Sequence, residues 1–171
     1  YEWGWIKKIP RIAVINASGA NTLYRLFNGH FENEKLRWDD GIPNFNLIQN
    51  LYDKMLEDES LKPKTKATAI QIGKPANITK GLRALDFTNG VVEEVTDTEM
   101  LDGMSVVGLN GFDCEMASGA SVAGIKKLRD KEIIKKDDKV VGILTGRQKE
   151  PLLPIDYHNN PANRFARPPK N

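Results

Sequence analysis

The chain has little of what a membrane, a nucleic acid or an oxidising compartment would require. Its 171 residues include one cysteine, Cys114, so no internal disulfide can form, and we expect this thiol to be a small buried hydrophobe beside Phe112. No apolar run approaches the roughly 18 residues that a membrane-spanning helix needs. The 25 basic residues nearly balance the 23 acidic ones, for a formal net charge of +2. A dedicated nucleic-acid surface is therefore not expected either.

Histidine is equally scarce. His30 and His158 lie near opposite ends of the chain, and neither has a cysteine or a carboxylate at the spacing of a metal site. Neither residue has the partners of a catalytic triad nearby in sequence. We therefore predict no metal site.

What the chain does contain is an alternation of apolar runs with helical patterns. We predict strands at 11–16, 67–72, 91–95, 112–115 and 140–144. A short helix is predicted after the turn at 17–20, followed by longer helices that begin near 44, 77, 96 and 118. Alternation of this kind is typical of an α/β fold with a mostly parallel sheet flanked by helices.

The segment after Lys139 is the most informative part of the chain. Val140 to Leu144 is almost continuously apolar, which predicts a strand covered on both faces. Thr145 follows directly, at the carboxyl end of the strand, where open α/β sheets bind ligands. Gly146 would let the backbone approach a ligand without a side chain in the way. Thr145 is therefore a candidate ligand contact, and the alternative is a simple turn after a core strand.

Four ordered segments carry a resemblance to a known family. They read Ala-Thr-Ala-Ile-Gln-Ile-Gly-Lys-Pro at 67–75, Gly-Val-Val-Glu-Glu-Val-Thr-Asp at 90–97, Glu-Met-Ala-Ser-Gly-Ala at 115–120 and Ile-Leu-Thr-Gly at 143–146. This set resembles the threonine synthases, although Met116 stands where the family has proline. The ending Ile-Asp-Tyr-His-Asn-Asn at 155–160 is similar to the tail of the plant-type members.

The resemblance implies an enzyme of the tryptophan-synthase-β fold type, also called fold type II, whose large domain binds pyridoxal 5'-phosphate. Its reaction would convert O-phosphohomoserine and water into threonine and phosphate. Thr145 would hydrogen-bond the nitrogen of the cofactor ring, and Gly146 would give clearance. Backbone at Ile72 and Gly73 would flank the ring. Glu115 and Ser118 would lie along the cofactor pocket, with capping of the following helix as a further role for Ser118.

Two parts of that family are not found in this chain. No lysine stands in the family's Schiff-base setting, and there is no glycine-rich loop for the cofactor phosphate. We therefore expect the carboxyl-terminal part of an enzyme, inactive by itself, with both parts upstream. Residues 1–150 would belong to the cofactor-binding domain, with a helical insertion at 30–63. Residues 151–171 would form an extended, proline-rich tail packed on that domain.

Alternatives remain open from the sequence. A sister enzyme of the same fold type, such as a cysteate synthase or a threonine dehydratase, would share the sheet and the cofactor. A non-catalytic half-domain could instead serve as a regulatory or assembly partner. For the enzyme, we expect a homodimer with the remainder of the chain as a partner. We expect a cytoplasmic location, or an organelle if a targeting segment precedes Tyr1.

Overall fold

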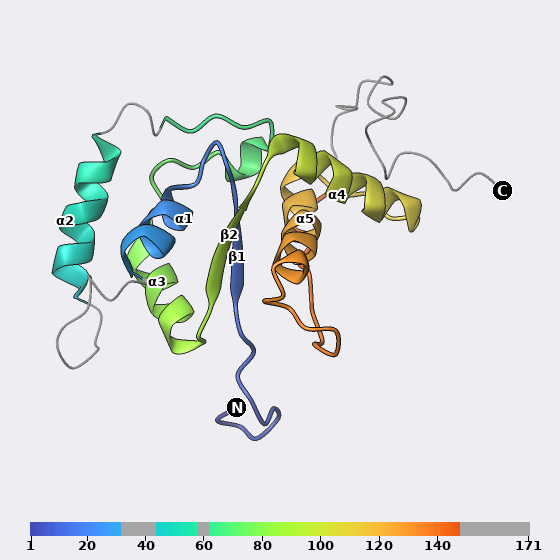
Figure 1. Ribbon diagram of the computed structural model, residues 1–171, viewed down its shortest axis with the longest axis horizontal. Coiled ribbons are helices and arrows are strands. Elements are labelled where there is room, and N and C mark those ends of the chain that lie inside the picture. The colour runs from blue at the N-terminus through green and yellow to red at the C-terminus, as the bar shows by residue number, and fades with distance from the viewer. Residues whose placement is uncertain (32–43, 58–61, 148–171) are drawn as a thin grey trace. The chain divides into compact units, whose positions relative to one another are not determined.

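The computed structural model describes residues 1–31, 44–57 and 62–147. Along the chain the elements follow the order β1, α1, η1, α2, η3, α3, β2, α4 and α5 (Figure 1). The fold is α/β, as predicted, with two parallel strands and five α-helices among the described residues. The chain divides into two compact units. The first consists of Tyr1–Pro63 and Ile72–Glu94, and the second of Lys64–Gln71 and the chain from Val95 onward.

The first unit carries the strand pair and the helices α1 to α3. Its elements are β1 (Ala13–Ala17), α1 (Thr22–Leu26), the π-helical turn η1 (Phe27–Phe31), α2 (Phe45–Leu56), α3 (Ile78–Phe87) and β2 (Val91–Val95). The strands at β1 and β2 and the short helix after β1 confirm the sequence prediction. One core cluster holds the helices against β2, formed by Leu26, Phe27, Ile48, Tyr52, Ile78, Leu82, Leu85 and Val92.

Helix α2 begins where the sequence predicts. The side chain of Asn44 accepts a hydrogen bond from the amide of Leu47 at 3.1 Å, which satisfies one of the free amides of the first turn. Ile48 and Tyr52 form the buried face, while Leu47 is 43% exposed. The fully buried face of α2 is therefore narrow.

Helix α3 ends at Phe87, and the chain then turns back at Asn89 and Gly90. Asn89 takes the left-handed backbone conformation, with φ of 48°. Gly90 is needed for space, because a Cβ there would lie 2.8 Å from the carbonyl oxygen of Ile12 and 2.7 Å from a methyl group of Leu85. Glycine at this position therefore lets the chain return closely along β1.

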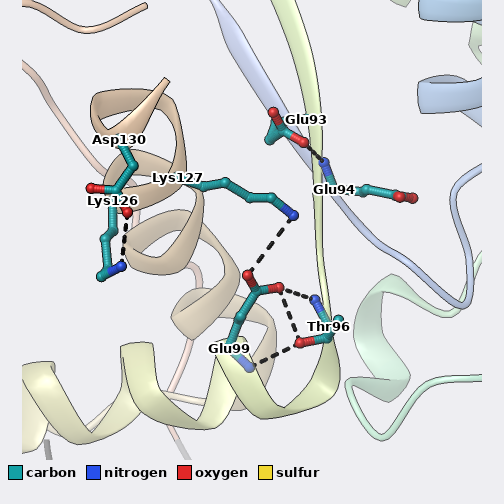
Figure 2. A network of polar contacts seen from close by, with 7 residues as sticks. All are labelled: Glu93, Glu94, Thr96, Glu99, Lys126, Lys127 and Asp130. Atoms are coloured by element: carbon teal, nitrogen blue, oxygen red, sulfur yellow. Dashed lines mark hydrogen bonds and ion pairs between the residues drawn. The ribbon is translucent and has the colours of Figure 1, made fainter. Parts of the chain in front are cut away.

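The second unit contains η3 (Thr68–Ile70), α4 (Asp97–Leu109) and α5 (Met116–Asp130). A capping box, whose Thr-x-x-Glu pattern at 96–99 is visible in the sequence, opens α4. The hydroxyl of Thr96 accepts from the amide of Glu99 at 3.2 Å, and the Glu99 carboxylate accepts from the amide of Thr96 at 2.7 Å. The same carboxylate lies 3.8 Å from the Nζ atom of Lys127 in the last turn of α5 (Figure 2). The start of α4 is thus tied to the end of α5. No helix among the described residues is long and apolar enough to cross a membrane.

Three predicted strands are wrong. Residues 67–72, 112–115 and 140–144 form no strand, because within the described ranges only β1 and β2 pair in a sheet. Residues 67–72 instead make local hydrogen bonds and form the 3-10 helix η3. Val141 is 88% exposed, so the expected burial of 140–144 on both faces is also wrong.

The predicted tail at 151–171, and residues 32–43 and 58–61 of the predicted insertion, lie outside the described residues. Helix α2 occupies the described part of that insertion.

Helices α4 and α5 touch through two glycines. A Cβ at Gly103 would lie 2.3 Å from the carbonyl oxygen of Gly119, and a Cβ at Gly119 would lie 2.3 Å from the carbonyl oxygen of Met100. Backbone atoms cannot move aside as the end of a long side chain can. Any side chain at either position would therefore push the helices apart.

We expect Gly103→Ala to lower the free energy of unfolding by about 1–3 kcal/mol, the usual cost of overpacking a well-filled interior. Gly108→Ala in the same helix is the matched control, because a Cβ at Gly108 meets nothing within 4 Å. Alanine is the better helix former, so the control should be unchanged or up to about 1 kcal/mol more stable. Urea unfolding measures both values. Equal stabilities for the two variants would contradict the close contact.

Candidate functional site

Four of the six residues predicted at the site lie together in the second unit. Glu115 and Ser118 come from the start of α5, and Thr145 and Gly146 come from the segment that returns along this helix. The amide of Glu115 donates to the carbonyl oxygen of Gly146 at 2.9 Å, and four further hydrogen bonds join Ser118 to the returning segment. The structure therefore brings these four residues together.

Ser118 is the buried centre of this cluster, with no exposed surface. Its Oγ atom accepts hydrogen bonds from the backbone amides of Thr145 at 2.8 Å and Gly146 at 3.2 Å. The same atom lies 3.1 Å from the hydroxyl oxygen of Thr145 and 3.4 Å from the carbonyl oxygen of Gly146. The predicted capping role of Ser118 is wrong, because Glu115 occupies the N-cap position of α5 and Ser118 lies inside the helix.

Thr145 joins the buried Ser118 to the half-buried Glu115. Its side chain is exposed, and its hydroxyl donates to the Oε1 atom of Glu115 at 2.9 Å. The three side chains therefore form a chain of hydrogen bonds from the interior to the surface, with a hydroxyl in the middle. Such a hydroxyl can donate one hydrogen bond and accept two.

The space beside Gly146 is filled by Glu115. A Cβ at Gly146 would lie 2.8 Å from Oε1 and 3.0 Å from Cδ of that side chain. The sequence predicts clearance for a ligand at this glycine. In the structure, the missing side chain makes room for the carboxylate that accepts from Thr145. A larger residue would force Glu115 to move.

Ser121 is a contributor that the sequence analysis missed. Its hydroxyl donates to the carbonyl oxygen of Ile143 at 3.0 Å, one turn along α5 from Ser118. Close to this bond, a Cβ at Gly142 would lie 2.9 Å from the Cδ1 atom of Ile125. Helix α5 thus holds the returning segment with side-chain hydroxyls and a tight apolar contact. The spacing of the two serines was the available signal, since residues three apart share a helix face.

Ile72 and Gly73, the other two predicted site residues, belong to the first unit. Ile72 is 50% exposed. The carbonyl oxygen of Gly73 accepts from the buried hydroxyl of Thr22 at 2.8 Å, and a Cβ at Gly73 would lie 2.9 Å from Pro63. The loop at Gly73 is therefore fixed locally by Thr22, which sequence reasoning missed. Its place beside a cofactor ring remains a prediction.

Cys114 lies directly before the site and is buried, as predicted, with 3% of its surface exposed. Phe112 is 68% exposed, so it does not share this burial. Burial raises the pKa of the Cys114 thiol, and the neighbouring carboxylates of Asp113 and Glu115 raise it further. The thiol therefore stays protonated to a higher pH than an ordinary cysteine.

We expect Cys114 to react slowly with iodoacetamide, because the thiolate is the nucleophile and a raised pKa lowers its fraction at any given pH. The rate should still rise above pH 9.0, the ordinary thiol value, where a small thiol begins to level off. Protein unfolded in urea is the control and should react as fast as a small thiol. A folded-state rate equal to that of the unfolded protein would contradict the burial.

Comparisons with known proteins give a consistent result. A family model described as "Pyridoxal-phosphate dependent enzyme" matches residues 2–146. A threonine synthase from Methanosarcina acetivorans is 34% identical over 168 residues, and one from Methanocaldococcus jannaschii is 34% identical over 160 residues. Threonine synthase 2, chloroplastic, from Arabidopsis thaliana is 30% identical over 173 residues.

These matches cover most of this chain but a smaller part of each relative. They span 90%, 92% and 98% of the chain, in the order given, and 41%, 34% and 29% of the respective relatives. The chain therefore spans less than half the length of the curated relatives it matches.

Proposed function

Since the chain belongs to the family of pyridoxal-phosphate dependent enzymes, we propose that it forms the carboxyl-terminal part of a threonine synthase. The family resemblance predicted from the sequence motifs is confirmed by the family match. The proposed reaction converts O-phosphohomoserine and water into threonine and phosphate, as a carbon–oxygen lyase. The relatives described above are all threonine synthases, which favours this substrate over those of a cysteate synthase or a threonine dehydratase.

At the level of single residues, the proposal rests on the position and the hydrogen bonds of the Thr145 hydroxyl. It is exposed, it is held by a buried serine, and its proton lies on the side of Glu115. The nitrogen of a pyridine ring accepts one hydrogen bond. A ring that enters from outside can reach only an exposed donor, as Thr145 is. The donor set at Thr145 therefore fits the cofactor ring, with Gly146 adding no side chain beside it.

Pyridoxal phosphate, when bound, supplies an electron sink for removal of a proton from the amine-bearing carbon of the substrate and then from the carbon next to it. Thr145 would donate its hydrogen bond to the ring nitrogen. A hydroxyl is neutral, so it would not hold a proton on that nitrogen as a carboxylate would. The backbone at Ile72 and Gly73 would flank the ring. Glu115 would line the pocket near Thr145, and the buried Ser118 would support that pocket from behind Thr145.

The remainder of the enzyme is the first partner to expect. Val140, Val141, Ile143 and Leu144 are between 43% and 88% exposed, and this apolar surface lies beside the proposed site. In a complete fold-type-II enzyme, neighbouring strands would cover it. From the family resemblance we also propose a homodimer and a cytoplasmic location, or an organelle if a targeting segment accompanies the enzyme. The 1–150 domain and its packed tail remain part of this proposal.

We expect Thr145→Val in the complete enzyme to lower kcat/KM for O-phosphohomoserine by roughly 5-fold to 150-fold. The valine keeps the shape but leaves the ring nitrogen without its donor, at a cost of about 1–3 kcal/mol. Phosphate release measures the activity. Thr145→Ser is the control, because it keeps the hydroxyl and should retain most of the rate. A valine variant with unchanged kinetics would refute the assignment of Thr145.

The 171-residue chain alone should hold no pyridoxal phosphate covalently, because it has no lysine in the family's Schiff-base setting. Titration with the cofactor followed by borohydride reduction and peptide mapping checks this. We expect weak labelling scattered over surface lysines. Stoichiometric labelling of a single lysine would show that the chain carries its own cofactor lysine and is not the part we propose.

A further inference from the structure

The hydrogen bonds around Ser118 fix where its proton lies. A hydroxyl group has one proton to donate and two lone pairs that accept. The amides of Thr145 and Gly146 occupy both lone pairs of Ser118 Oγ, at 2.8 Å and 3.2 Å. Ser118 must therefore donate, either to the Thr145 hydroxyl at 3.1 Å or to the Gly146 carbonyl at 3.4 Å. The nearer oxygen is the better acceptor, because 3.4 Å is well beyond the usual length of an O–H···O hydrogen bond.

The direction of the Thr145 proton follows from this. Ser118 has no lone pair left, so the Thr145 hydroxyl cannot donate inward to it. Its proton must lie on the outer side, where Glu115 Oε1 accepts at 2.9 Å. Ser118 is fully buried and Thr145 is exposed, so a ligand that enters from outside would reach Thr145 and not Ser118.

We propose that Ser118 is a positioning residue that fixes the Thr145 hydroxyl as an outward-facing hydrogen-bond donor to the cofactor ring nitrogen. This inference rests on the proposed function, because it requires a pyridine nitrogen at Thr145. Ser118 acts through Thr145 and makes no contact with the cofactor itself. Glu115 accepts the same proton in the absence of the ring, so the donor is already directed before the ring arrives.

A double-mutant cycle on the complete enzyme tests this inference. Binding of pyridoxal phosphate to the cofactor-free enzyme is measured for Ser118→Ala, Thr145→Val and the double variant. We expect Ser118→Ala alone to weaken binding roughly 3-fold to 10-fold, the value of one neutral hydrogen bond. In the Thr145→Val background the serine change should have no further effect, because the group through which it acts is gone. A serine that only supports the backbone would weaken binding equally in both backgrounds, and that result would overturn the proposal.

The ring nitrogen gives a second readout that is independent of activity. With 15N-labelled pyridoxal phosphate bound, the nitrogen resonance should shift in Ser118→Ala in the direction seen for Thr145→Val. Ser121→Ala is the matched control, since it removes a hydroxyl from the same helix face that binds the same segment at Ile143. It should leave the resonance in place. An unshifted resonance in Ser118→Ala would also overturn the proposal.

The outcomes separate this inference from the proposed function. If Thr145→Val changes neither the affinity nor the resonance, the assignment of Thr145 itself fails. If Thr145→Val changes both and Ser118→Ala changes neither, only the role of Ser118 fails. If Ser118→Ala does not fold, the cycle is run with Ser118→Cys. Its thiol takes the place of the hydroxyl but is a weak hydrogen-bond donor and acceptor. The same dependence on Thr145 is then expected with a smaller change.

Discussion

The second unit depends on the backbone contact between α4 and α5. Gly103 and Gly119 carry no side chain, and a Cβ at either position would overlap a carbonyl oxygen of the facing helix. Gly119 directly follows Ser118, so the residue that holds Thr145 lies one position from this close contact between the helices. The ion pair between Glu99 and Lys127 also joins these helices, but it is partly exposed and such pairs contribute little. Close packing, and not charge, therefore sets the position of Ser118.

Hydroxyl groups on helix α5 bind the segment that carries Thr145, and no β-ladder takes part among the described residues. Ser118 and Ser121 lie on one face of α5 and bind the returning segment at Thr145, Gly146 and Ile143. These bonds satisfy backbone groups that a neighbouring strand would otherwise satisfy. The bonds from Ser118 hold Thr145 in place, while Val141 and the other apolar residues of the segment remain exposed. These residues therefore keep their hydrogen bonds although, among the described residues, no strand pairs with this segment.

The sequence predicts those features whose hydrogen bonds form between residues only a few positions apart. The capping box of Thr96 and Glu99 and the cap at Asn44 are closed within three residues, so the pattern alone is enough. The strand at 140–144 needs a neighbour to pair with, and its apolar pattern says nothing about whether one is present. The role of Ser118 was missed for a related reason. A serine near a helix start predicts a cap, whereas its partners here lie 27 and 28 positions further along the chain.

Gly146 shows how a missing side chain can prepare a polar site. Its lack of a Cβ leaves room for the Glu115 carboxylate, which accepts the proton that Thr145 directs outward. Thr145 therefore never has an unsatisfied donor, whether or not a ring is bound. In the proposed complex the hydroxyl would exchange one acceptor for another with little reorientation, so less of the binding free energy would be lost to ordering. In the proposed complex, the neutral hydroxyl of Thr145 and not the carboxylate of Glu115 would contact the ring nitrogen. A carboxylate in that position would favour a proton on the nitrogen, whereas the hydroxyl would donate its own proton and leave the nitrogen neutral.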